Sequence, residues 1–228
     1  MRVKDADSAF KIGTDALLLG AYIDAADHIE ALEVGSGCGI ISLMVGRKCS
    51  NLKITGIDID AASVMEANAN AKWNNLEDRI VFLEQDFNSI RDRQFDLIFS
   101  NPPYFENSLH PEDLRKSNSR HTSALSFEEL ISGVASHLIP GGSFYCIIPS
   151  EYEQKITSLA SDVLLNLRRA LVIRSLRKNP AIRSILCFVK DGNKTNILKN
   201  ELSLQNSLKR NDWSEDYKSL LQEFKSFD

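Results

Sequence analysis

The chain has 228 residues, a formal net charge of −4 and 43% hydrophobic residues. This composition is typical of a globular protein, and the length suits one sizeable core rather than two full domains. A mildly acidic chain argues against a general nucleic-acid coat protein, although it allows a local basic surface.

The sequence contains no targeting, membrane or metal signature. Its apolar runs are too short to span a bilayer, and its first ten residues carry early charges without the apolar region of a secretory signal. The four cysteines are scattered, with no C-x-x-C pair among them. We therefore expect a cytoplasmic protein that binds neither a membrane nor a metal.

Short β-type runs alternate with helical segments along the first half of the chain. The expected elements, in chain order, are a strand at 30–34, a helix at 40–47, a strand at 53–57, a helix at 61–73 and strands at 80–83 and 95–99. Asp60 is placed to cap the helix at 61–73. Such alternation predicts βαβ units that share a parallel sheet.

The second half continues the pattern and then breaks it. We expect a helix at 127–138 with Ser126 as its cap, a strand at 143–148, a helix at 151–167 and strands at 169–173 and 183–189. The last two strands have no helix between them, so they should form an antiparallel hairpin at one edge of the sheet. The polar segment after them contains one amphipathic stretch, 213–224, which we expect to dock on the body.

A glycine-rich loop joins the first strand to the first helix. Gly35, Gly37 and Gly39 follow Glu33, and glycines there allow a tight turn and a close approach of the backbone to a ligand. Alone the motif is a weak signal, because NAD enzymes, flavoproteins and methyltransferases all use such loops. The third glycine comes too early for the G-x-G-x-x-G of dinucleotide sites, which disfavours a dehydrogenase.

Acidic residues follow the next two strands. We assign Asp58, with Ile59 beside it, to the ribose of a nucleoside and Asp60 to helix capping; the alternative is that both acids only cap the helix. Asp86 is a candidate acceptor for an adenine amino group, with Phe87 against the ring face. The alternative for this pair is a loop acid and a core phenylalanine.

The most informative stretch is Asn101, Pro102, Pro103 and Tyr104, which follows an apolar strand directly. The prolines fix the backbone and leave carbonyls as acceptors, while Tyr104 supplies an aromatic face. Hydrogen bonds from a planar NH₂ group to Asn101 and Pro102 strengthen as positive charge grows on the nitrogen, so they favour the transition state of methyl transfer. We assign these four residues to catalysis, with Asn101 also bordering the cofactor.

The glycine loop, Asp58 and the Asn-Pro-Pro-Tyr motif together resemble the class I methyltransferases, within them the branch that methylates amino groups. The resemblance implies S-adenosylmethionine as the cofactor, bound at the glycine loop. It also implies an α/β fold, namely a doubly wound, mostly parallel, Rossmann-like seven-stranded sheet with an antiparallel terminal hairpin.

Three further segments resemble bacterial tRNA (adenine-N6)-methyltransferases that act beside the anticodon of a valine tRNA. Residues 10–21 are similar to the entry motif of that family, 118–127 to the segment after its catalytic motif and 213–217 to its C-terminal signature. The entry motif adds Thr14 and Asp15 to the expected cofactor site. The resemblance implies N6-methylation of an adenosine in tRNA.

We expect one methyltransferase domain over 1–228, with an entry segment at 1–28, a catalytic core at 29–190 and a tail at 191–228 packed on the core. The stretch 163–190 contains no acidic residue, which in an acidic protein suggests a phosphate-facing surface; the alternative is that its arginines only solvate an edge strand. The long segment 105–124 also carries basic residues. The expected RNA contacts are Arg115, Lys116, Arg120, Arg177, Lys178 and Arg183.

Two other functions share parts of this pattern. A protein glutamine N5-methyltransferase acting on a release factor would use the same Asn-Pro-Pro-Tyr motif, because an amide NH₂ presents the same geometry. A non-catalytic RNA-binding module could keep the fold without turnover. The intact glycine loop, Asp58 and Asn101 favour an enzyme, and the entry motif favours tRNA.

Overall fold

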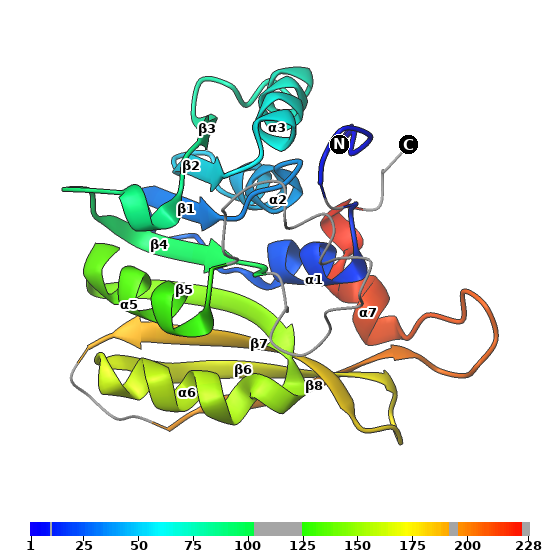
Figure 1. The fold of residues 1–228 in the computed structure, drawn as a ribbon. Coiled ribbons are helices and arrows are strands. Elements are labelled where there is room, and N and C mark those ends of the chain that lie inside the picture. The colour runs from blue at the N-terminus through cyan, green and yellow to red at the C-terminus, as the bar shows by residue number, and fades with distance from the viewer. Residues whose placement is uncertain (10, 103–124, 192–195, 225–228) are drawn as a thin grey trace, which may run out of the picture.

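The computed structural model describes residues 1–9, 11–102, 125–191 and 196–224. Its centre is an eight-stranded sheet in the order β3-β2-β1-β4-β5-β7-β6-β8 (Figure 1). The strands are β1 (Glu30–Val34), β2 (Lys53–Asp58), β3 (Ile80–Glu84), β4 (Phe95–Ser100), β5 (Leu138–Pro149), β6 (Leu165–Leu176), β7 (Ala181–Lys190) and β8 (Leu198–Gln205).

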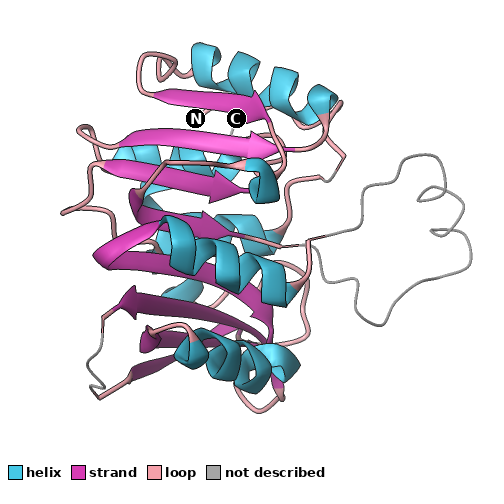
Figure 2. Ribbon diagram, turned by 60° about the vertical axis from the view of Figure 1, so that its left-hand side comes forward, coloured by secondary structure: helices cyan, strands magenta, loops and turns pink. Residues whose placement is uncertain are grey.

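Helices cover both faces of this sheet (Figure 2). They are α1 (Thr14–Tyr22), α2 (Ile40–Lys48), α3 (Ala61–Trp73), α5 (Phe127–His137), α6 (Glu153–Asp162) and α7 (Glu215–Leu220). Residues of α1, α2 and α3 share one apolar cluster with the sheet, and residues of α5 and α6 share the other. Along β5 the side chains alternate between the two: Tyr145 and Ile147 lie in the first cluster, Phe144 and Ile148 in the second. The doubly wound α/β fold class is thereby confirmed.

Local signals place several helix starts where the sequence predicts them. Helix α3 spans the predicted 61–73, and the Asp60 carboxylate accepts a hydrogen bond from the Ser63 backbone N–H at 2.8 Å. Ser126 and Glu129 form a reciprocal capping box at the start of α5.

The chain departs from expectation after α6. This helix ends at Asp162 rather than at 167, because Leu164 takes a left-handed φ of 63° and the next residue already belongs to β6. The hairpin of β6 and β7 is antiparallel as predicted, but it does not lie at the sheet edge. Strand β8 pairs in parallel with β6 and adds an eighth strand beyond the seven expected.

The C-terminal segment docks on the body, as its amphipathic pattern predicts. Phe224 is buried in the cluster that contains α1 and α2, and Tyr217, Leu220 and Leu221 pack against that cluster. Among the described residues, no helix is both long and apolar enough to cross a membrane, and no group of three or more His, Cys, Asp or Glu side chains is arranged to hold a metal ion.

Candidate functional site

Four parallel strands have their carboxyl ends at the same end of the sheet. Val34 of β1 is in register with Ile57 of β2 and with Ser100 of β4, and Asp58 is in register with Glu84 of β3. The strand order reverses between β1 and β4, since β2 lies on one side of β1 and β4 on the other. In doubly wound sheets, ligands bind in the crevice outside such a reversal. The structure therefore brings the loops after β1, β2 and β4 to one place.

The loop after β1 has a backbone that only glycine adopts readily. Gly35, Gly37 and Gly39 have φ values of 73°, 51° and 81°, all in the left-handed region. A Cβ atom on Gly39 would lie 2.5 Å from the Phe82 ring, whereas one on Gly35 or Gly37 would meet no atom of the described residues within 4 Å. Gly39 is thus required by packing, and the other two leave open space above the loop.

Glu33 lies beneath this loop and is almost completely buried. One carboxylate oxygen, Oε2, accepts a hydrogen bond from the Ser42 backbone N–H at 3.1 Å, and the Ser42 hydroxyl bonds to the same oxygen. The other oxygen, Oε1, is buried without a hydrogen-bond partner among the described residues. Burial raises the pKa of Glu33 to about 8, and the charge of Asp58 adds to this rise. An orphaned carboxyl oxygen at this depth is costly unless a ligand completes it.

Asp58 ties the second strand to the glycine loop. Its Oδ2 accepts a hydrogen bond from the Gly37 N–H at 2.8 Å and its Oδ1 one from the Asp60 N–H at 3.0 Å. The carboxylate remains half-exposed, and the neighbouring Ile59 side chain is 52% exposed. Asp60 caps α3 as predicted, while the assignment of Asp58 to a ribose stays a prediction.

The loop after β3 places its two candidates differently. Asp86 is exposed, and its Oδ1 accepts a hydrogen bond from the Asn88 backbone N–H at 2.9 Å. Phe87 is buried, with its ring where a Cβ on Gly133 of α5 would stand. Phe87 is therefore a core residue, which is the alternative that the sequence leaves open for it.

Asn101 and Pro102 follow β4 at the strand reversal. Ser100 fixes the end of the strand, because its hydroxyl donates to the Val34 carbonyl at 2.8 Å. Asn101 is half-buried and Pro102 buried. The remaining predicted residues of this region, Pro103, Tyr104, Arg115, Lys116 and Arg120, lie outside the described residues.

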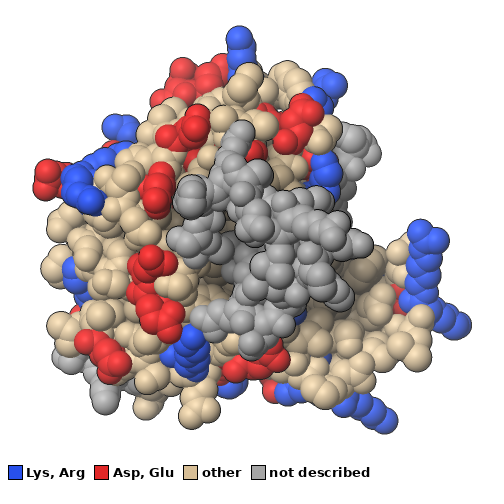
Figure 3. Space-filling view, in the orientation of Figure 1, with Lys and Arg blue, Asp and Glu red and all other residues tan. Residues whose placement is uncertain are grey.

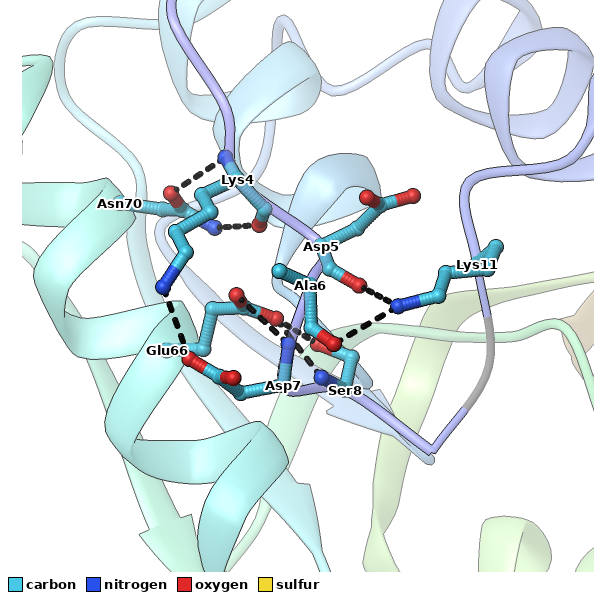
Figure 4. Close-up of polar contacts among 8 residues, drawn as sticks. All are labelled: Lys4, Asp5, Ala6, Asp7, Ser8, Lys11, Glu66 and Asn70. Carbon is cyan, nitrogen blue, oxygen red and sulfur yellow. Dashed lines mark hydrogen bonds and ion pairs between the residues drawn. The ribbon is translucent and has the colours of Figure 1, made fainter.

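The N-terminal segment packs along α3, where Asn70 and Glu66 bind its backbone (Figure 4). The buried Asn70 side chain accepts from the Lys4 backbone N–H at 2.9 Å and donates to the Lys4 carbonyl at 2.7 Å. It also donates to the Cys38 carbonyl inside the glycine loop at 2.9 Å. Glu66 receives the backbone N–H groups of Asp7 and Ser8 at 3.1 and 2.8 Å.

Sequence reasoning misses Asn70, although a signal exists. Asparagine is a weak helix former, so Asn68 and Asn70 in the interior of α3 indicate side chains with fixed partners.

Replacing Asn70 by alanine is expected to reduce the free energy of unfolding by about 2–3 kcal/mol, because the buried Cys38 carbonyl and the partly buried N–H and carbonyl of Lys4 lose their partner. Urea denaturation measures the loss. The exposed Asn200→Ala substitution on β8 is the matched control and should change stability by less than about 0.5 kcal/mol. Equal stability of the two variants would contradict a bridging role for Asn70.

Acids from distant parts of the chain neutralise much of the basic stretch 163–190. Arg183 donates to Asp15 of α1 at 2.7 Å. The sequence predicts Arg183 as an RNA contact and Asp15 as a cofactor contact, but here the two side chains pair with each other. Thr14 is exposed beside them. Three more ion pairs join the stretch to acids elsewhere: Arg168–Asp191, Arg169–Asp24 and Arg174–Glu201. Arg177 and Lys178, in the turn between β6 and β7, are exposed.

Known proteins resemble this chain in sequence and in fold. The model of the methyltransferase small domain matches residues 6–168. A tRNA1(Val) (adenine(37)-N6)-methyltransferase of Bacteroides thetaiotaomicron is 33% identical over 95% of this chain and 90% of its own. Its counterpart from Phocaeicola vulgatus is 35% identical over 95% and 91%. An Agrobacterium tumefaciens protein described as a predicted O-methyltransferase superposes with a TM-score of 0.70 at 16% identity, over 92% of this chain and 96% of its own.

The two sequence relatives match nearly end to end, and the structural match shows that the fold is that of class I methyltransferases. The chain therefore belongs to the methyltransferase small domain family and, within it, to the family of the tRNA1(Val) (adenine(37)-N6)-methyltransferases.

Proposed function

We propose that this protein transfers a methyl group from S-adenosylmethionine to N6 of an adenosine in tRNA, at the position beside the anticodon of a valine tRNA. The observation that carries the proposal is the placement of Asn101 and Pro102 at the end of β4, next to the glycine loop across the strand reversal. The name shared by the relatives supports the choice of acceptor. A tRNA acceptor also agrees with the cytoplasmic location expected from the sequence.

The described residues fit the proposed cofactor. S-adenosylmethionine, when bound, supplies a methyl group on a positively charged sulfur. The open space above Gly35 and Gly37 admits a ligand close to the backbone, and the free Oε1 of Glu33 offers an acceptor beneath it. Asp58 presents a half-exposed carboxylate for ribose hydroxyls, with Ile59 beside it and Asp86 on the next loop. Thr14 and Asp15 remain candidates at the start of α1.

Asn101 and Pro102 act on the acceptor. The lone pair of an adenine amino nitrogen is delocalised into the ring, so the nitrogen is a weak nucleophile. The Asn101 side-chain oxygen and the Pro102 carbonyl accept hydrogen bonds from the NH₂ group, and these bonds strengthen as the nitrogen becomes positive. No strong base is needed beforehand, because the extra proton is acidic after transfer. Stacking of the base on Tyr104 stays a sequence prediction.

The acceptor is tested by incubating the protein with labelled S-adenosylmethionine and either bulk tRNA or a release factor, followed by mass analysis of the nucleosides. We expect N6-methyladenosine in tRNA and no label in the protein. A valine tRNA transcript with guanosine in place of the adenosine beside the anticodon should lose the label. Label in a release-factor glutamine, with none in tRNA, would instead establish the glutamine reaction.

Replacing Asp58 by alanine is expected to weaken S-adenosylmethionine binding by about 1.5–3 kcal/mol, because a charged hydrogen-bond acceptor is lost. Calorimetry measures the change. Asp60→Ala is the matched control: it removes the cap of α3 and should lower stability by about 1 kcal/mol with little change in affinity. Similar affinity losses in both variants would remove the distinction between the two acids.

A further inference from the structure

Two exposed loops start from neighbouring strand ends, at the end of the sheet that holds the candidate site. One is the turn 177–180 between β6 and β7, and the other is the segment 206–212 after β8, which projects from the body at the right of Figure 1. They begin at neighbouring positions, because the last residue of β6, Leu176, is in register with the last residue of β8, Gln205.

Both loops lie at the same end of the sheet as Asn101, the end where β4, β6 and β8 have their carboxyl ends. Strand β5 is parallel to β4, β7 is antiparallel to β5, and β6 is antiparallel to β7, so β6 runs in the direction of β4. Strand β8 is parallel to β6. The strands β6 and β8 stand three and four strand spacings from β4, which is roughly 14 and 19 Å at about 4.8 Å for each spacing.

The loops carry four exposed basic side chains: Arg177, Lys178, Lys209 and Arg210. Figure 3 shows Lys and Arg side chains on the projecting loop at the right and others at the lower right. No side-chain hydrogen bond or ion pair to these four is found among the described residues.

Two acids bear on the charge of these loops: Glu201 on β8, and Asp212 at the end of the second loop. Glu201 bonds to Arg174, and Arg177 adds only weakly to the lowered pKa of its carboxyl. Asp212 accepts hydrogen bonds from the Ser207 and Asn206 side chains, at 2.5 and 3.2 Å, and these neutral donors leave its negative charge in place. The two loops together therefore carry four basic side chains and one acid, which is a net positive charge.

The basic character of these loops therefore differs from that of the strands beneath them. Arg168, Arg169, Arg174 and Arg183 are neutralised by acids, whereas the loops keep their positive charge for solvent or a ligand. Leu208 adds an apolar contact on the projecting loop, since it is 88% exposed, more than any other large apolar side chain that the structure describes. Exposed basic residues around an apolar tip are suited to contacts with phosphates and sugars.

We infer that the two loops form one phosphate-binding surface, here called the basic rim, which holds the RNA strand that leads away from the target adenosine. The inference rests on the proposed function and extends it from the base to the backbone. A stacked strand places one phosphate about every 3.4 Å along its axis, so roughly 14–19 Å corresponds to about four to six nucleotides. The basic rim therefore contacts a stem-loop but not a short oligonucleotide centred on the target.

The double substitution Lys209→Ala/Arg210→Ala tests the inference in the full chain. With an anticodon stem-loop as substrate, we expect KM to rise roughly twofold to thirtyfold with kcat nearly unchanged. The slope of log KM against log salt should become shallower by about 1.4–1.8, because two phosphate contacts are lost. With a trinucleotide that contains the target adenosine, KM should equal that of the wild type. Arg177→Ala/Lys178→Ala should behave in the same way.

The matched control is Arg47→Ala/Lys72→Ala, which removes two exposed basic residues from the last turns of α2 and α3. These turns lie at the opposite end of the sheet, where the parallel strands begin. The control should leave KM and the salt slope unchanged. If the wild type methylates the stem-loop and the rim variants show the same KM and salt slope, the inference is overturned while the proposed function stands. Absence of tRNA methylation by the wild type itself would instead reject the proposed function, and the inference with it.

Discussion

Replacing Asn101 by alanine is expected to lower the rate of tRNA methylation about a hundredfold or more, with the affinity for S-adenosylmethionine nearly unchanged. Removing one group that stabilises developing charge typically has an effect of this size. The position of Asn101 supports the separation, because Asn101 follows β4, whereas the glycine loop follows β1 and Asp58 is the last residue of β2. Single-turnover methylation measures the rate, and calorimetry measures the affinity.

Asn200→Ala is the matched control for this experiment, since it makes the same substitution on the exposed side of β8. It should methylate at the rate of the wild type. Asn101→Asp separates hydrogen bonding from charge, because aspartate keeps an acceptor oxygen at the same place. Turnover of Asn101→Ala within a fewfold of the wild type would remove Asn101 from the mechanism.

The sequence predicts those parts of the fold that depend on local signals. Helix α3 has its predicted bounds because Asp60 caps it and apolar residues recur at helical spacing behind it. The strand ends at Val34, Asp58 and Ser100 lie at or one residue beyond the predicted 34, 57 and 99, because each buried run stops at a glycine, an acid or an Asn-Pro pair. Parallel strands then bring these three points together, which is why the sequence alone predicts a ligand site at this end of the sheet.

Strand β8 could not be predicted, because its stability comes from pairing with β6 rather than from its own pattern. Only Leu202 among its residues is buried, so the segment reads as polar. The early end of α6 has a similar cause: Leu164 turns the chain with a positive φ, for which the sequence offers no glycine or asparagine as a signal.

The ion pairs could not be predicted from the sequence either. Arg183 and Asp15 are 168 residues apart in the chain, and Arg169 and Asp24 are 145 apart. The acid-free stretch 163–190 therefore looks like one basic surface in the sequence, while in the fold four of its arginines face acids and the charge that remains exposed lies in the loops.

Glu33→Gln is expected to remove a strong pH dependence from the stability of the protein. Burial raises the pKa of Glu33 from 4.5 to about 8, so between these values the folded protein holds a proton that the unfolded chain releases. The stability that this proton provides is complete below pH 4.5 and is lost as the pH rises through 8. The wild type should lose roughly 3–4 kcal/mol relative to Glu33→Gln between pH 5 and 8.

Urea denaturation of both proteins at several pH values measures this difference, in which the other titrating groups cancel. Glu30→Gln is the matched control on the same strand, because the Glu30 side chain is 47% exposed. Its stability should follow the wild type across the range. Parallel curves for Glu33→Gln and the wild type would show that Glu33 is already ionised in the folded protein.

The wild type and Glu33→Gln also test whether the free oxygen of Glu33 contributes to cofactor binding. A positively charged ligand beside Glu33 favours its ionised form, so binding should release the proton that the folded protein holds near pH 7. Calorimetry of S-adenosylmethionine binding in two buffers with different ionisation enthalpies counts the protons released. The wild type should release more protons than Glu33→Gln, and the amino group of the ligand contributes equally to both. Equal proton release, together with equal affinity, would mean that Glu33 supports the glycine loop through Ser42 alone.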